Sequence, residues 1–157
     1  MKNKFKVLCK DDLYSTVLVK VDYNDYHGNS VYEHHTPFGI AETIREFEMY
    51  LDLLSCKEIM EYRDYSGGNI LHDMARCDKS IKYFDIVLET IGDSSFIKLL
   101  KMNDRNNSYP LSEISNLNVF KYLLSFINIS GDMLYQISVN CRNKEILDYL
   151  ANLINGV

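Results

Sequence analysis

The stretch DYSGGNILHDMA (residues 64–75) can be interpreted in two incompatible ways, and the choice between them decides the fold class. Its glycine pair and its His72–Asp73 pair are found both in catalytic or phosphate-holding loops and in the turn and first helix of a structural repeat. A phosphate loop needs the spacing GxxxxGK[ST] and a dinucleotide loop needs GxGxxG, and neither spacing occurs in the chain. Adjacent helical residues face different directions, so His72 and Asp73 alone do not form a catalytic pair. The repeat interpretation is favoured.

A similar turn pattern recurs along the chain. Each copy has Asp or Asn followed three positions later by Gly or Asn, which both tolerate the left-handed backbone of tight turns. Successive copies are 39, 40 and 24 residues apart. The four copies are Asp25/Gly28, Asp64/Gly67, Asp104/Asn107 and Asn128/Gly131.

An apolar stripe with helical spacing follows each candidate turn, and polar residues separate its members. Four stripes that each follow the same kind of turn indicate a repeat of amphipathic helices. Short helices are also expected within residues 55–64 and 94–104. The stripes are Phe47/Tyr50/Leu51/Leu54, Phe84/Val87/Leu88/Ile91, Phe120/Leu123/Leu124/Ile127 and Leu147/Leu150/Ala151/Ile154.

The turn and first helix at 64–75 resemble the ankyrin repeat, in which a β-turn precedes a helix opened by T-P-L-H. The segment NDRNNSYPL (103–111) followed by VFKYLL (119–124) is similar to the same family. The family's alanine pair is reduced to Ala75, and the unit at 104–127 is short enough to require a clipped first helix or no turn. The residues that carry the resemblance are Asp64, Gly67, Asn69, Leu71, His72 and Ala75.

The resemblance implies a mainly α fold, an ankyrin-type helix-turn-helix stack of about three to four repeats. We place the repeats near 25–63, 64–103, 104–127 and 128–157. In this family a histidine at the position of His72 braces neighbouring turns. The format is similar to that of small viral IκB-like ankyrin proteins such as the polydnaviral vankyrins.

Residues 1–24 lack the repeat pattern. Residues 4–10 and 15–23 are rich in alternating or β-branched apolar residues, and the polar Lys10–Asp12 separates them. This pattern predicts a β-hairpin. An isolated hairpin is marginally stable, so we expect it to cap the open end of the first repeat. A separate small β-module with its own partner is the alternative.

Composition narrows the functional classes. The chain has 157 residues, a net charge of −5 and a pI near 5.3, which argues against nucleic acid binding. No secretory leader or membrane-spanning segment is expected, and four scattered cysteines favour reduced thiols in the cytoplasm. No metal or other cofactor is expected. Twelve lysines against five arginines, with 14 asparagines, are typical of AT-rich genomes, including those of many viruses and intracellular parasites.

The predicted function is non-enzymatic docking of a partner protein on the turn tips and first helices. The resemblance implies a host regulatory protein as partner, such as a Rel/NF-κB factor, which the chain would inhibit as an immune modulator in the host cytoplasm or nucleus. We expect a monomer or weak dimer. The predicted protein-binding residues are Tyr26, His27, Tyr65, Ser66, Arg105, Asn106 and Asp132.

Two alternatives remain open. The first is a small enzyme or metal-binding module near the N-terminal β-segment that uses His34, His35 or Cys9. The second is a structural subunit that self-associates through its last helix, Leu147 to Ile154.

Overall fold

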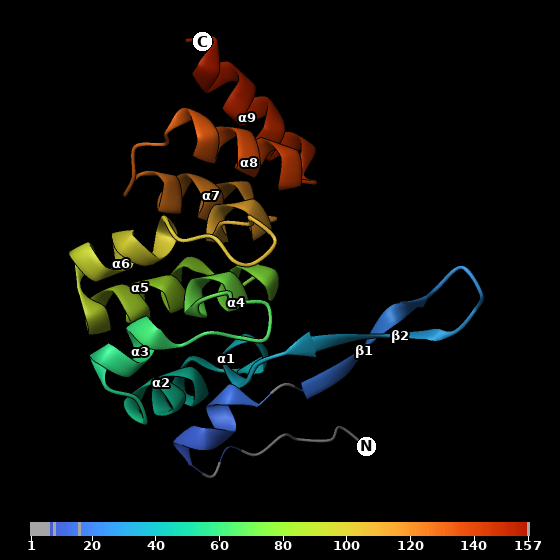
Figure 1. Ribbon diagram of the computed structural model, residues 1–157, viewed down its shortest axis with the longest axis vertical. Helices are drawn as coiled ribbons and strands as arrows, with labels where there is room; N and C mark the ends of the chain where they lie inside the picture. The colour runs from blue at the N-terminus through green and yellow to red at the C-terminus, as the bar shows by residue number, and fades with distance from the viewer. Residues whose placement is uncertain (1–6, 8, 16, 157) are drawn as a thin grey trace.

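The computed structural model describes residues 7, 9–15 and 17–156, and these are mainly helical with one small antiparallel sheet near the N-terminus (Figure 1). This confirms the predicted fold class at that level. Within the described residues, no helix combines the length and apolar character needed to cross a membrane. In chain order the elements are η1 (Lys10–Tyr14), β1 (Val17–Asn24), β2 (Ser30–His35), α1 (Pro37–Ile40), α2 (Ile44–Asp52), α3 (Cys56–Glu61), α4 (Ile70–Arg76), α5 (Ile81–Ile91), α6 (Asp93–Leu100), η2 (Pro110–Glu113), α7 (Leu117–Leu124), α8 (Gly131–Asn140) and α9 (Lys144–Ile154).

Most of these helices begin at a polar residue whose side chain accepts a hydrogen bond from the first turn. Asn69, for example, accepts from the backbone N–H groups of Leu71 and His72. Such caps matter here because helices of four to eleven residues are marginal without caps and tertiary packing. The capping side chains belong to Thr36, Thr43, Ser55, Asn69, Asn116, Ser130 and Asn143.

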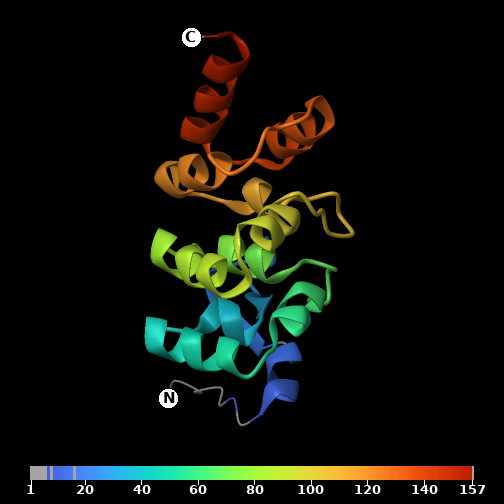
Figure 2. The ribbon, with the colours of Figure 1, turned by 90° about the vertical axis from the view of Figure 1, so that its left-hand side faces the viewer.

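The helices pack in two rows along an elongated stack (Figures 1 and 2). One row contains η1, α1, α4, η2 and α8, each in contact with the next. The other row contains α2 and α5, which contact each other, and α7 and α9, which do the same. The short helices α3 and α6 both pack on α5. These are the helices expected within residues 55–64 and 94–104.

The predicted apolar stripes form about a third of the core, supplying ten of the 29 buried hydrophobic residues in the described part of the chain. Phe47, Phe84 and Phe120, which open the first three stripes, are completely buried. The fourth stripe is only partly correct, because the buried residues of α9 are Ile146 and Leu150, whereas Ile154 is 60% exposed. Among the described residues, no further helix covers the outer side of α9.

The predicted N-terminal hairpin is misplaced. Lys10–Asp12, expected to form the turn, lie in η1 (Lys10–Tyr14), and β1 pairs with β2. Of the expected first strand, residues 4–6 and 8 lie outside the described residues. The hairpin that forms runs from 17 to 35, crosses the expected boundary at 24/25, and projects from the stack (Figure 1).

Among the described residues, the element that packs on α1 at this end of the stack is therefore η1 and not the hairpin. Leu13 is completely buried, and its carbonyl accepts a hydrogen bond from the Tyr62 hydroxyl at 3.3 Å. Tyr14 packs against the ring of Tyr62 with centroids 5.4 Å apart. An exposed pair between Lys10 and Glu58 ties the same helix to α3.

The fourth candidate turn is also wrong. Gly131 is the first residue of α8, and Ser130 caps that helix by accepting from the backbone N–H of Met133. Gly131 is not among the glycines with positive φ. A small polar residue before a helix gives the same sequence signature as a turn, which explains the error.

Candidate functional site

The turn at 64–68 is closed by one carboxylate oxygen. Asp64 Oδ1 accepts from the backbone N–H groups of Ser66 and Gly68, both at 2.8 Å, and from the Ser66 hydroxyl at 2.7 Å. Gly67 takes a φ of 78°, in the region that favours glycine. This explains why the pattern needs Asp first and Gly or Asn three residues later.

Two other turns repeat this geometry. Asp104 Oδ1 accepts from the N–H groups of Asn106 at 2.8 Å and Ser108 at 3.0 Å, and Asn107 has a φ of 58°. At the hairpin tip, Asp25 Oδ1 accepts from the N–H groups two and four residues later, and Gly28 has a φ of 80°. Three of the four candidate turns are therefore one structural type.

Arg76, at the end of α4, joins the second turn to the third. Its Nη1 lies 2.7 Å from Asp64 Oδ2 and its Nη2 lies 2.6 Å from Asp104 Oδ2, while its Nε lies 3.7 Å from Glu113. Both aspartate side chains are 1% exposed. Each aspartate thus closes its own turn with one oxygen and holds Arg76 with the other. The role of Arg76 could not be predicted from the sequence, because a basic residue in the last turn of a helix is common.

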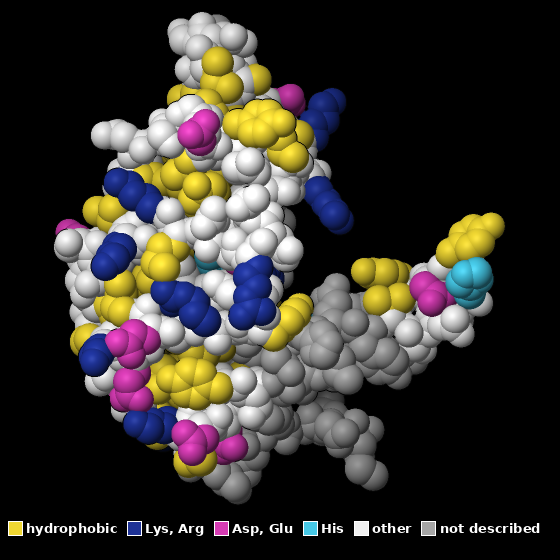
Figure 3. Space-filling view, in the orientation of Figure 1, with side chains coloured by type: hydrophobic (Ala, Val, Ile, Leu, Met, Phe, Trp, Pro, Cys, Tyr) yellow, Lys and Arg dark blue, Asp and Glu magenta, His cyan; other side chains and the backbone are white. Residues whose placement is uncertain are grey.

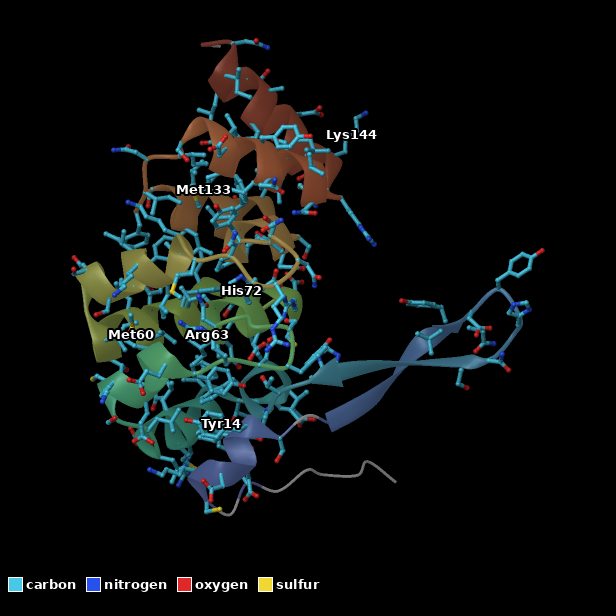
Figure 4. All side chains as sticks on the ribbon, in the orientation of Figure 1. Tyr14, Met60, Arg63, His72, Met133 and Lys144 are labelled. Carbon is cyan, nitrogen blue, oxygen red and sulfur yellow. The ribbon has the colours of Figure 1, made fainter. Side chains whose placement is uncertain are left out.

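His72 makes a second link between the same two turns (Figure 4). It is completely buried, its Nδ1 accepts from the Asn69 N–H at 3.0 Å, and its Nε2 lies 2.7 Å from the Ser108 carbonyl. Because Nδ1 accepts, Nε2 carries the proton and donates to Ser108. Burial holds the pKa of His72 below its usual value of 6.5, which keeps the ring neutral. The residue is the brace that the sequence predicted.

A buried carboxyl pair lies beneath this surface. Asp73 is 4% exposed and accepts from the Thr36 hydroxyl at 3.0 Å. Burial, and then the neighbouring Asp64, raise the pKa of Asp73 well above 3.8. Burial also opposes ionisation of Asp64, but hydrogen bonds from Asp73, Ser66 and Gly68 and the charge of Arg76 hold its pKa below 3.8. Asp64 is therefore the ionised member of the pair and Asp73 the protonated one.

The structure brings together three of the predicted binding residues. The Arg105 N–H donates to the Ser66 carbonyl at 3.0 Å, and Arg105 Nη1 donates to the Tyr65 carbonyl at 3.1 Å. The Tyr65 side chain is 59% exposed despite these bonds to its backbone. Tyr65, Ser66 and Arg105 form one fixed platform, which we call the turn platform.

Tyr26 and His27 lie apart from the turn platform, at the tip of the hairpin. Tyr26 is 98% exposed, and its ring meets the His27 ring edge-on with centroids 5.4 Å apart. Figure 3 shows an open hollow between the hairpin tip and the upper part of the stack. The tip and the stack thus present two separate contact surfaces.

The last two predicted binding residues occupy different places. Asn106 lines a polar groove of about 540 Å³ between the third turn and the α8–α9 connection, together with Asn140 and Arg142. Asp132 lies in the first turn of α8, whereas the groove meets the C-terminal end of that helix. Figure 1 shows the connection that precedes α8 on the side of the stack opposite the hairpin. Asp132 is therefore not part of the same surface.

The alternative site near the N-terminus is not assembled as predicted. Cys9 Sγ lies 3.7 Å from Asp12 Oδ2, whereas His35 Nδ1 lies 3.1 Å from Cys77 Sγ. The side chain of His34 lies outside the described residues. Among the described residues, no group of three or more His, Cys, Asp or Glu side chains is arranged to hold a metal ion.

Comparison with protein-family models, with curated proteins and with solved structures found no match to this chain.

Proposed function

We propose that this chain is a non-enzymatic protein-binding module built from divergent ankyrin-like repeats, and that a partner protein docks on the turn platform and the hairpin tip. The observation that carries the proposal is the contrast between a fixed backbone and exposed aromatic side chains. Tyr65 is 59% exposed and Tyr26 is 98% exposed, although each lies in a turn closed by an aspartate carboxylate.

Such residues are suited to docking because tyrosine offers a large rigid area with a polar end. A side chain on a preorganised turn loses little entropy when a partner orders it, so more of the contact energy remains as affinity. Arg105 adds a cation beside Tyr65, and arginine is a frequent interface anchor. The hairpin tip gives the same partner a second point of attachment across the hollow seen in Figure 3.

The partner class follows from the resemblance to small viral ankyrin proteins. It favours a host regulatory protein, which the chain would restrain by occupying its binding surface. The chain would act in the cytoplasm or nucleus of that host. We also propose that the chain acts as a monomer or weak dimer.

The test is affinity capture from lysates of candidate host cells, with paired variants analysed by quantitative mass spectrometry. The wild-type chain is compared with a Tyr65→Ala/Arg105→Glu double variant and with Tyr26→Ala. Lys98→Glu/Lys101→Glu is the matched control, because these exposed lysines lie at the end of α6, outside the turn platform. We expect one protein to be enriched by the wild type and the control and depleted at least fivefold by the platform variant. Equal enrichment by all variants contradicts the proposal.

A further inference from the structure

Cys77 and His35 form a thiol–imidazole pair outside the turn platform. Cys77 follows the last residue of α4, and His35 is the last residue of β2. The distance from His35 Nδ1 to Cys77 Sγ is 3.1 Å, and both side chains are partly buried. Arg76, Asp64 and Asp73 line the same small pocket, and Arg76 is already paired with Asp64.

The pair has the composition of an activated thiol. The thiolate is the nucleophilic form of cysteine, and a neighbouring imidazole that accepts the thiol proton favours that form. The other three thiols lack such a partner among the described residues. Cys9 lies beside the carboxylate of Asp12, and Cys56 Sγ donates to the Thr90 carbonyl at 3.3 Å. Cys141 is buried and lies 3.6 Å from the Asn143 carbonyl.

The packing around Cys77 leaves no room for an added group. The free space at the pocket is about 10 Å³, too small for a substrate. A Cβ atom built on Gly39 in α1 would lie only 2.6 Å from Cys77 Sγ. Any group attached to this sulfur must therefore displace α1 or the end of β2. Those two elements are joined through Thr36, so a displacement there acts at the base of the hairpin.

We propose that Cys77 is the reactive thiol of this chain, that it forms a mixed disulfide with small disulfides such as oxidised glutathione, and that the adduct displaces the base of the hairpin. His35 accepts the thiol proton, and the Cys77 sulfur then attacks one sulfur of the reagent. A new S–S bond forms as the old one breaks, and the departing thiolate leaves with the electron pair and takes the proton from the imidazolium. Cys77 is oxidised and the reagent disulfide is reduced, so no further oxidant is required.

The thiol chemistry goes beyond the proposed function and does not depend on it. Displacement of the hairpin would alter docking only if the hairpin tip contacts a partner, so that effect rests on the proposed function. The two are distinguished because the tests below measure sulfur reactivity and backbone exposure without any partner.

The first test follows the reaction of the full chain with oxidised glutathione at neutral pH by intact mass and peptide mapping. We expect Cys77 to react at least about tenfold faster than the more exposed Cys9 and Cys56, because thiolate character outweighs exposure. His35→Gln is expected to slow Cys77 by about tenfold and to leave Cys56 unchanged. Reaction at Cys9 or Cys56 first, or an unchanged Cys77 rate in His35→Gln, overturns the proposal.

The buried Cys141 provides an internal control for unfolding. If His35→Gln unfolded the chain, Cys141 would become reactive and Cys77 would react faster, which is opposite to the expected direction. In that case the reactivity of the folded wild type is measured against pH instead. The proposal then requires the ratio of the Cys77 rate to the Cys56 rate to be largest in mild acid and to fall as pH rises past about 8.5, where an ordinary thiol ionises, and a constant ratio overturns it.

The second test compares hydrogen exchange of the glutathionylated chain with that of a Cys77→Ser variant treated in the same way. Exchange is expected to increase in α1 and at the C-terminal end of β2 in the adduct, with α7 and α9 unchanged. Equal exchange in α1 in the two samples shows that the adduct is accommodated without displacement and overturns that part of the proposal.

Discussion

Replacing Arg76 with methionine is expected to destabilise the fold more than any other change to a charged side chain. Methionine keeps much of the side-chain length but removes the guanidinium that lies 2.7 Å from Asp64 and 2.6 Å from Asp104. Both aspartate side chains are 1% exposed, so water does not replace the lost partner. Removing one member of a buried ion pair costs about 3–5 kcal/mol. That is a large part of the roughly 5–15 kcal/mol that stabilises a domain.

The assay is urea unfolding followed by circular dichroism at neutral pH. With a slope of about 2 kcal/mol per molar urea, the midpoint should fall by roughly 2 M. Arg142→Met is the matched control, since Arg142 is exposed and should change stability by less than about 0.5 kcal/mol. Asp104→Asn in the Arg76→Met background should cost much less than Asp104→Asn alone. A loss below about 1 kcal/mol in Arg76→Met, or additive effects in this cycle, would refute the reasoning.

Three further outcomes follow from the same region. His72→Gln should reduce the loss of stability that accompanies falling pH in a plot of stability against pH. Burial holds the folded-state pKa of His72 below 6.5, so the neutral ring stabilises the fold above that pH and this contribution is lost as pH falls. Asp73→Asn should have the same urea midpoint as the wild type in acid and a higher one at alkaline pH. The raised pKa of Asp73 in the folded state stabilises the fold at low pH, and this contribution is lost as pH rises through the folded-state pKa. Gly67→Ala should lower the thermal midpoint by about 2–6 °C, which corresponds to a loss of roughly 1–2 kcal/mol. The φ of Gly67 is 78°, and an added Cβ atom would lie 3.1 Å from Arg105. Gly131→Ala in α8 is the control and should not lower the thermal midpoint.

Much of the fold follows from local patterns in the sequence. Asp64, Gly67 and the stripe that begins at Phe84 predict a turn and an amphipathic helix, because turn chemistry and helical periodicity are properties of neighbouring residues. The short helices α3 and α6 were predicted for the same reason. The segment where the predicted third repeat requires a clipped first helix forms η2, a four-residue 3-10 helix that follows a complete turn.

What could not be predicted depends on partners distant in sequence. The pairing of β1 with β2 was missed because the turn at Asp25 was assigned to a repeat, although the same turn also closes a hairpin. Arg76 carries no local signal, since its two aspartates lie 12 and 28 residues away. The segment Thr36–Pro37 does carry a local signal, because a threonine before a proline caps the start of α1, as Asn69 caps the start of α4. Of the candidate site, the turn platform was predicted, whereas the pairing of His35 with Cys77 required the fold.

The two links between the second and third turns also bear on how the chain unfolds. In a linear array each unit touches only its neighbours, so cooperativity depends on the coupling between adjacent units. Here His72 and Arg76 couple the second and third turns through buried polar contacts, whereas α9 at the far end leaves Leu153 and Ile154 half exposed. The region that contains these two turns should therefore behave as one foldon, and local opening should begin at α8 and α9 well below the global unfolding free energy. A partner that binds the turn platform would then contact the most stable part of the molecule, while helices α8 and α9 continue to open locally.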